Sequence, residues 1–238
     1  MNYETNNGLK KSARIAGLFY ILTQIPGSIA LLYVPTRIII DQNAEATTRN
    51  LLSHEFLFRL SIVGQLTSLI LFLFLAFILY NLFRQINQFN AKLLASFVLI
   101  QIPIVFLLET FNFASLMIAK DEILQSFQRE QKQNLIMLFI AMRQYGMKVL
   151  EIFWGLWLIP FGMLVYFSKF IPRIFSVCLF IGGIGWISDS ITYLLLPDDY
   201  SYISKYTVWT GAIGELPIML WLLIKGVKNN NTRLAKEK

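Results

Sequence analysis

Six long apolar tracts dominate this sequence, and each holds at most one acidic or basic residue. They are Ile15–Thr36, Leu60–Phe83, Leu93–Ala119, Val149–Ser168, Ile174–Pro197 and Tyr206–Ile224. At a rise of about 1.5 Å per residue, each tract forms a helix of about 28 Å or more, which is enough to cross the hydrocarbon core of a bilayer. The tracts are continuously apolar and do not alternate, so they predict helices and not barrel strands.

The sequence therefore predicts an all-α, polytopic membrane protein with a bundle of six transmembrane helices. Of the 238 residues, 56% are hydrophobic and 15% are charged, which excludes a soluble enzyme, a disordered chain and a disulfide scaffold. We expect residues 1–238 to form a single integral membrane domain, with residues 134–148 as an outward extension of the fourth helix. The predicted spans are residues 15–34, 60–83, 93–119, 149–168, 174–197 and 206–224.

The basic residues predict the orientation of the chain. The net charge is +7, and placing the N-terminus in the cytoplasm puts twelve of the 21 Lys and Arg residues in inner segments. Because basic residues accumulate in cytoplasmic loops, we expect both termini to be cytoplasmic. The expected location is the cytoplasmic (inner) membrane of a bacterium. The basic residues are distributed according to the predicted membrane topology, so the net positive charge does not indicate a nucleic-acid partner. The expected partners are membrane lipids.

Two outer segments carry specific expectations. Lys120–Leu135 combines charges of both signs with spaced Leu and Phe residues, which predicts a surface helix lying over the bundle. The segment from Pro197 to Tyr200 is predicted to be a short acidic turn. Aromatic residues gather near it, as expected for an anchor at the membrane interface: Tyr200, Tyr202, Tyr206 and Trp209.

Four carboxylates lie inside the predicted spans, where each costs about 2.5–3.5 kcal/mol on insertion scales for Asp and so calls for an explanation. With the termini inside, all four lie between the midplane and the outer surface: Glu109, Glu151, Asp189 and Glu215. Gln65 lies in the same half, one and a half turns below Arg59. The pattern indicates a polar cavity that opens to the outer side.

Two interpretations of these polar groups remain open. In the first, they line a pocket for a ligand or cation, with Glu109, Asp189, Glu215, Gln65, Arg59 and Glu151 as candidate binding residues. In the second, Arg59, Arg143 and Lys148 neutralise carboxylates in pairs that fix helix packing. Glu151 follows Lys148 by three residues and can pair with it on one helix face. Glu109, Asp189 and Glu215 have no cation nearby in the sequence.

The chain lacks the residues that most catalytic mechanisms require. One histidine, His54, and one cysteine, Cys178, exclude an intrachain disulfide, a cysteine-based zinc site, bis-histidine haem ligation and a zinc site with several histidines. No Gly-x-Ser-x-Gly elbow is present, and Asp189 is the only aspartate inside a span. We therefore predict no catalytic residue, no metal site and no cofactor, and the sequence disfavours an enzyme.

Several short stretches resemble a bacterial membrane family known as domain of unknown function 4386. They are Ala13-Arg14-Ile15-Ala16-Gly17-Leu18, Leu57-Phe58-Arg59-Leu60, Phe153-Trp154-Gly155-Leu156, Pro172-Arg173-Ile174, Gly185-Trp186-Ile187-Ser188-Asp189-Ser190, Gly214-Glu215-Leu216 and Leu220–Val227. The resemblance implies six helices and points to Arg59, Asp189 and Glu215, but it implies no activity. The family pattern has a histidine where this chain has Trp157, and an aspartate near Gln65–Leu69 that is absent here.

The sequence favours a multi-pass membrane protein that binds or transports a small molecule, a lipid or an ion in a polar pocket of the outer half. The alternative is a non-catalytic structural or regulatory membrane protein whose buried carboxylates serve helix packing. The first interpretation predicts that Glu109, Asp189 and Glu215 converge around a cavity. The second predicts a dry bundle in which each carboxylate is capped by Arg59, Lys148 or a hydroxyl.

Overall fold

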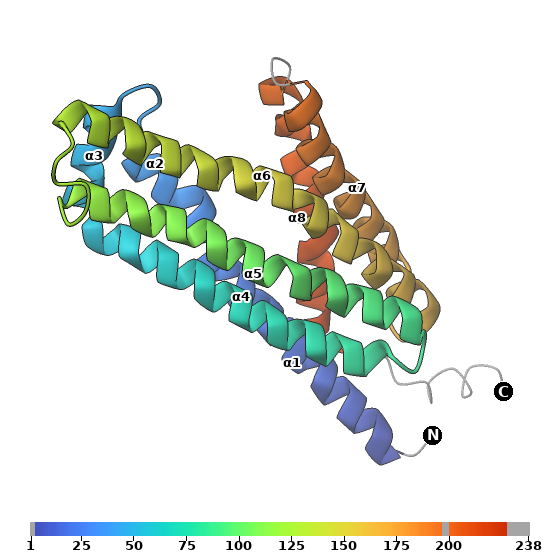
Figure 1. Ribbon diagram of the computed structural model, residues 1–238. Helices are drawn as coiled ribbons and strands as arrows, with labels where there is room; N and C mark the ends of the chain where they lie inside the picture. The colour runs from blue at the N-terminus through green and yellow to red at the C-terminus, as the bar shows by residue number, and fades with distance from the viewer. Residues whose placement is uncertain (1–2, 197–199, 228–238) are drawn as a thin grey trace. The chain divides into compact units, whose positions relative to one another are not determined.

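The computed structural model describes residues 3–196 and 200–227, and every regular element in them is a helix (Figure 1). The short elements are the π-helix η1 (Ile29–Tyr33), α2 (Val34–Ile38) and α3 (Ala44–Ser53). The long helices are α1 (Tyr3–Ser28), α4 (Glu55–Phe83), α5 (Gln88–Ala119), α6 (Arg129–Ser168), α7 (Ile174–Leu195) and α8 (Tyr200–Ile224).

Within residues 3–196 and 200–227, six helical segments are long and apolar enough to cross a membrane, which confirms the predicted all-helical class and agrees with the six predicted spans. They are Gly8–Ile38, Glu55–Phe83, Gln88–Ala119, Arg129–Ser168, Ile174–Leu195 and Tyr202–Ile224. Most extend beyond the apolar tracts of the sequence, because a helix continues through the polar residues at the membrane surface until a turn or cap ends it. Asn87, for example, caps the start of α5 by accepting a 3.0 Å hydrogen bond from the backbone N–H of Asn90.

The segment between α5 and α6 corrects one prediction. Residues 120–128 form turns and not the expected surface helix, with left-handed backbone at Asp121 (φ 59°) and Leu124 (φ 57°). These two conformations interrupt the helical hydrogen-bond ladder, and α6 begins only at Arg129. From there α6 runs unbroken to Ser168, so residues 134–148 belong to the same helix as the fourth apolar tract. The predicted acidic turn at 197–199 lies outside the described residues.

The chain forms two compact units, and the long helices α1, α4, α5 and α6 each contribute to both. Unit 1 comprises Met1–Ile21, Leu71–Gln101 and Val149–Lys238, and unit 2 comprises Leu22–Ile70 and Ile102–Lys148. Each unit has its own apolar core. These two cores contain only some of the apolar side chains of the helices. In a membrane protein, apolar side chains outside the core contact lipid.

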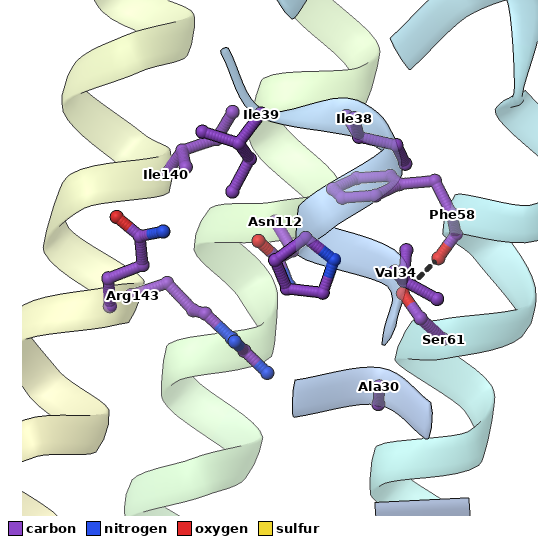
Figure 2. Close-up of a pocket in the computed structure, with 11 residues that line it drawn as sticks. Ala30, Val34, Ile38, Ile39, Phe58, Ser61, Asn112, Ile140 and Arg143 are labelled. Carbon is purple, nitrogen blue, oxygen red and sulfur yellow. Dashed lines mark hydrogen bonds between the residues drawn. The ribbon is translucent and has the colours of Figure 1, made fainter. Parts of the chain in front are cut away.

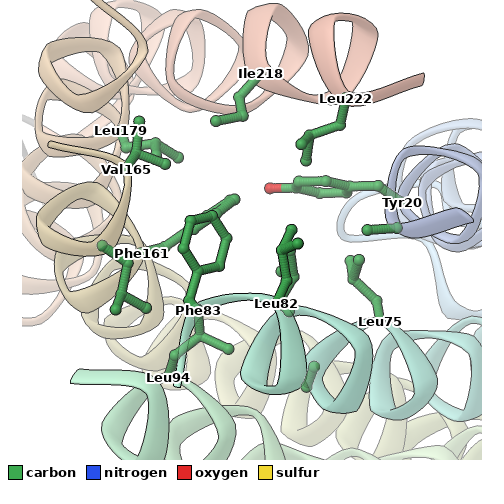
Figure 3. Close-up of a cluster of buried hydrophobic side chains, with 14 of the residues drawn as sticks. Tyr20, Leu75, Leu82, Phe83, Leu94, Phe161, Val165, Leu179, Ile218 and Leu222 are labelled. Carbon is green, nitrogen blue, oxygen red and sulfur yellow. The ribbon is translucent and has the colours of Figure 1, made fainter. Parts of the chain in front are cut away.

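The core of unit 1 draws on every long helix (Figure 3). Tyr20 of α1, Leu82 of α4 and Leu94 of α5 meet Phe161 of α6, and Leu179 and Ile218 close the core from α7 and α8. Trp157 packs edge-on to the rings of Tyr20 and Phe72, with centroids 5.7 and 5.0 Å apart. The core of unit 2 is smaller and combines α2 and α3 with parts of α4, α5 and α6, including Ile38, Leu51, Phe58, Leu116 and Ile136.

Glycines bring the backbones of α7 and α8 into direct contact within unit 1. A Cβ atom built on Gly214 would lie 2.7 Å from the Cα of Gly182, and one built on Gly182 would lie 2.8 Å from the Cα of Gly214. Both distances are well inside van der Waals contact, and backbone atoms cannot rotate away. This is the small-residue packing by which membrane helices approach closely in the absence of a hydrophobic driving force.

We predict that Gly214→Ala lowers the free energy of unfolding by about 1–3 kcal/mol, the usual effect of overpacking a tight contact. The matched control is Gly64→Ala in α4, where the new Cβ would lie 3.6 Å from the Cβ of Pro26, an ordinary contact. Unfolding in detergent, followed by circular dichroism, measures both variants. Equal stability of the two variants would contradict the close packing of α7 on α8.

Candidate functional site

A buried ion pair joins α5 and α6 in unit 2. The Nε and Nη2 atoms of Arg143 both donate to Oε1 of Glu109, at 3.1 and 2.8 Å. The other carboxylate oxygen, Oε2, accepts a 2.9 Å hydrogen bond from the side-chain amide of Asn112. The side chains of Arg143 and Glu109 are only 7% and 2% exposed, so this is a desolvated pair. Arg143 therefore supplies the cation that Glu109 lacks in its sequence neighbourhood.

Arg143 does not use all its donors in this pair. A guanidinium group carries five N–H donors, and its Nη1 amino group makes no hydrogen bond to any described residue. Arg143 also lines a small cavity of about 20 Å³ in unit 2 (Figure 2). In that view its guanidinium lies below Asn112 and is directed toward Ala30. A permanently charged side chain with spare donors thus borders the cavity.

The cavity is polar on one side and apolar on the other. Its polar lining comes from Ser61, Asn112, Arg143 and Gln144, and its apolar lining comes from Ala30, Val34, Pro35, Ile38, Ile39, Phe58 and Ile140. Its volume is enough for about one or two water molecules or a single small chemical group. The π-helix η1 supplies Ala30, and such one-turn π segments are frequent at functional sites.

Gln65 lies one helical turn beyond the cavity on α4. It is four residues after Ser61, which lines the cavity, and only 4% of it is exposed. Its Oε1 atom has no hydrogen-bond partner in the described part of the chain. A buried acceptor without a partner costs about 1–3 kcal/mol, so a group that supplies a donor there would be stabilising.

In unit 1, neutral donors surround the carboxylate of Glu215. The Tyr20 hydroxyl donates to its Oε2 at 2.7 Å, and the Trp186 indole N–H donates to its Oε1 at 3.2 Å. Tyr20 is fully buried. Sequence reasoning did not single out Tyr20 or Trp186, because an aromatic residue inside a span ordinarily indicates packing, and nothing in the pattern marks these two as hydrogen-bond donors.

The other predicted residues have different surroundings. Asp189 is fully buried in unit 1 and accepts a hydrogen bond from the Thr207 hydroxyl of α8, and Glu151 is 5% exposed in the same unit. Arg59 does not neutralise an intramembrane carboxylate, since its Nε donates to Glu55 at 2.7 Å. Glu55 also pairs with Lys120 at 3.1 Å. Hydrogen bonds from Lys120 to Glu122 and Glu55 raise the pKa of that lysine.

The candidate residues therefore fall into separate clusters. Glu109 joins Arg143 and Asn112 beside the cavity of unit 2, and Gln65 follows one turn along α4. In unit 1, Glu215 and Asp189 have different donors, Tyr20 with Trp186 for the first and Thr207 for the second. In the part of the chain that the structure describes, no three His, Cys, Asp or Glu side chains gather closely enough to hold a metal ion.

A family model described as a domain of unknown function, DUF4386, matches residues 15–226 of this chain. The chain belongs to the DUF4386 family. This finding confirms the resemblance seen in the short sequence stretches. No curated protein and no solved structure matches this DUF4386 protein.

The residues that the family model matches lie in both units. They include the ion pair of unit 2 and the Glu215 cluster of unit 1. Within the matched residues, Trp157 is 2% exposed and packs on Tyr20. A large apolar ring there supports the side chain that donates to Glu215.

Proposed function

We propose that this DUF4386 protein is a membrane-embedded binding protein that holds the polar group of a lipid or another membrane-soluble small molecule in the Arg143 cavity of unit 2. One observation carries the proposal: Arg143 lines the cavity, and of its five N–H donors only those on Nε and Nη2 bond to the described residues, both to Glu109. A charge-assisted hydrogen bond from a guanidinium to an oxygen is stronger than one between neutral groups, so a ligand oxygen at this donor would be held firmly.

The cavity also indicates which ligand groups fit. Arg143 presents only donors, so it favours a carbonyl, carboxylate or phosphoryl oxygen over a metal cation. At about 20 Å³, the cavity admits one small group and not a whole molecule. The apolar lining of α2 and η1 suits the hydrocarbon part of an amphiphile, which would remain in the surrounding bilayer.

A second candidate is a non-catalytic structural or regulatory membrane protein. The contacts of unit 1 favour it, since Glu215 accepts from Tyr20 and Trp186 and Asp189 accepts from Thr207. Carboxylates that are satisfied in this way fix the register of neighbouring helices and offer nothing to a ligand. This candidate explains unit 1 but not the unused donor of Arg143.

The proposed setting is the cytoplasmic membrane of a bacterium, with both termini in the cytoplasm. The distribution of basic residues supports this orientation. Lys10, Lys11 and Arg14 precede the first apolar tract, and Arg84 and Lys92 flank the link between α4 and α5. The cavity of unit 2 then belongs to the extracytoplasmic half of the membrane.

Binding is tested by titrating the purified protein in detergent with phosphatidylethanolamine and phosphatidylglycerol and measuring the midpoint of thermal unfolding. We expect lipid to raise the midpoint of the unmodified protein by several degrees and to leave Arg143→Lys unchanged. A lysine retains a charge for Glu109 but loses the planar fork of donors with which Arg143 could bind Glu109 and a ligand oxygen together.

Arg59→Lys is the matched control, because Arg59 forms a half-exposed pair with Glu55 and does not line the cavity. Its midpoint is expected to rise with lipid as that of the unmodified protein does. If Arg143→Lys responds to both lipids as strongly as Arg59→Lys, the proposed function is wrong.

Orientation is tested by cysteine labelling in intact cells after replacing the native cysteine with Cys178→Ser. Ser126→Cys lies in the exposed turns between α5 and α6, and Gln85→Cys lies in the exposed link between α4 and α5. We expect a membrane-impermeant maleimide to label Ser126→Cys and to spare Gln85→Cys until the cells are broken. The reverse pattern would overturn the proposed topology.

A further inference from the structure

Exposed basic side chains gather at one end of unit 1. They come from the first part of α1, the junction of α4 with α5, the junction of α6 with α7 and the end of α8. Residues 8–14, 84–92, 169–173 and 225–227 contain no Asp or Glu. We refer to these eight exposed residues as the basic surface of unit 1: Lys10, Lys11, Arg14, Arg84, Lys92, Lys169, Arg173 and Lys225.

Direct contacts bring the first part of α1 to the end of α8. The Nη2 atom of Arg14 donates to the carbonyl of Ile224 at 3.0 Å. Gly226 has a left-handed φ of 68°, and a Cβ built on it would lie 3.2 Å from Cγ of Lys10 and 3.4 Å from Cγ of Arg14. The chain that leaves α8 therefore packs against both of these cations, and Lys225 lies directly before the contact.

Aromatic contacts join the two helix junctions to the same end of unit 1. Trp221 of α8 packs against Phe175 in the first turn of α7, with centroids 5.2 Å apart. Phe170, between α6 and α7, stacks on Phe83, the last residue of α4, with centroids 5.7 Å apart. The cations of the α4–α5 and α6–α7 junctions thus lie at the end of unit 1 where α8 ends.

The basic surface of unit 1 has no carboxylate partners among the described residues, since none of its eight cations makes an ion pair there. Exposed cations of unit 2 differ. Arg129 pairs with Glu45 at 3.0 Å, and Lys132 pairs with Asp121 at 2.6 Å. Like charges that gather in one place repel one another, so an anion from outside the protein would stabilise this end of unit 1.

Exposed apolar side chains adjoin the basic surface. Ile174 follows Arg173 directly and is 62% exposed, and Ile224 precedes Lys225 and is 58% exposed. Cations beside exposed apolar side chains match an amphiphile that has an anionic head group and acyl chains. A free phosphate ion would use the cations alone.

We propose that the basic surface of unit 1 binds anionic phospholipids, whose phosphate oxygens pair with the clustered Lys and Arg side chains and whose acyl chains lie along the neighbouring apolar residues. The site is separate from the Arg143 cavity and does not rest on the proposed function. It selects lipids by net charge. Phosphatidylglycerol carries a net negative charge, whereas the ammonium group of phosphatidylethanolamine cancels the charge of its phosphate.

The test titrates the full-length protein in detergent with phosphatidylglycerol and phosphatidylethanolamine of the same acyl chains and derives affinities from the midpoint of thermal unfolding. At about 0.1 M salt we expect phosphatidylglycerol to bind at least about tenfold more tightly. At about 1 M salt, where the Debye length is only about 3 Å, the preference should vanish. The titrations of the Arg143 cavity are made at about 1 M salt, so that the basic surface does not contribute to them.

A triple variant with Lys10→Gln, Lys11→Gln and Lys225→Gln removes three of the cations and leaves the bond from Arg14 to α8 in place. Each charge removed should lower the affinity for phosphatidylglycerol about fivefold at about 0.1 M salt, so the three together should lower it on the order of a hundredfold. Arg143→Lys should retain the preference for phosphatidylglycerol under these conditions, because the cavity is a different site.

The matched control is a second triple variant, with Arg37→Gln, Arg49→Gln and Arg129→Gln. It removes the same number of charges from exposed residues of unit 2 and should keep the affinity for phosphatidylglycerol. Lipid-free unfolding midpoints verify that both triple variants are folded before their affinities are compared.

An equal loss of affinity in the two triple variants would overturn this inference, because net charge and not the basic surface of unit 1 would then attract the lipid. Unchanged affinity in the unit 1 variant would overturn it as well. Displacement of phosphatidylglycerol by an equal concentration of inorganic phosphate would contradict a lipid as the occupant. None of these results bears on the Arg143 cavity, which the titrations at about 1 M salt test separately.

Discussion

The buried ion pair of Arg143 and Glu109 is the interaction on which the account of unit 2 depends. A charge inside a bilayer is tolerated only with a partner, so α5 and α6 must meet in the register that brings these side chains together. The carboxylate has enough lone pairs for Arg143 and Asn112 together, whereas the guanidinium has more donors than the carboxylate can use. The unused amino group beside the cavity follows from that mismatch.

Unit 1 deals with its carboxylates differently. Hydroxyl and indole donors stabilise Glu215 and Asp189, and they come from the aromatic and threonine side chains of α1, α7 and α8. The glycines of α7 and α8 permit the close approach of these two helices. The buried acids of the two units thus have different partners: in unit 1 they accept from neutral donors of neighbouring helices, and in unit 2 Glu109 holds a cation that borders the cavity.

The six spans were predictable because a continuous apolar tract of that length forms few structures other than a transmembrane helix. The partners of the carboxylates were not, because they depend on which helix faces meet. Arg143 lies 34 residues from Glu109, and Tyr20 lies 195 residues from Glu215. The predicted surface helix after α5 was wrong because amphipathic spacing over 120–128 does not reveal the left-handed turns at Asp121 and Leu124. Gln65 was identified in the sequence, but its open acceptor required the structure.

The coupling free energy between Glu109 and Arg143 tests the central claim most directly. It is obtained from the unfolding free energies of the unmodified protein, Glu109→Gln, Arg143→Met and the double variant in mixed micelles. We predict that Arg143→Met alone loses about 3–5 kcal/mol, because it leaves a buried carboxylate without its cation, and that Glu109→Gln restores at least about 2 kcal/mol of this loss. A coupling of at most about 1 kcal/mol, the value typical of exposed pairs such as Arg59 with Glu55, would contradict a desolvated ion pair at the cavity.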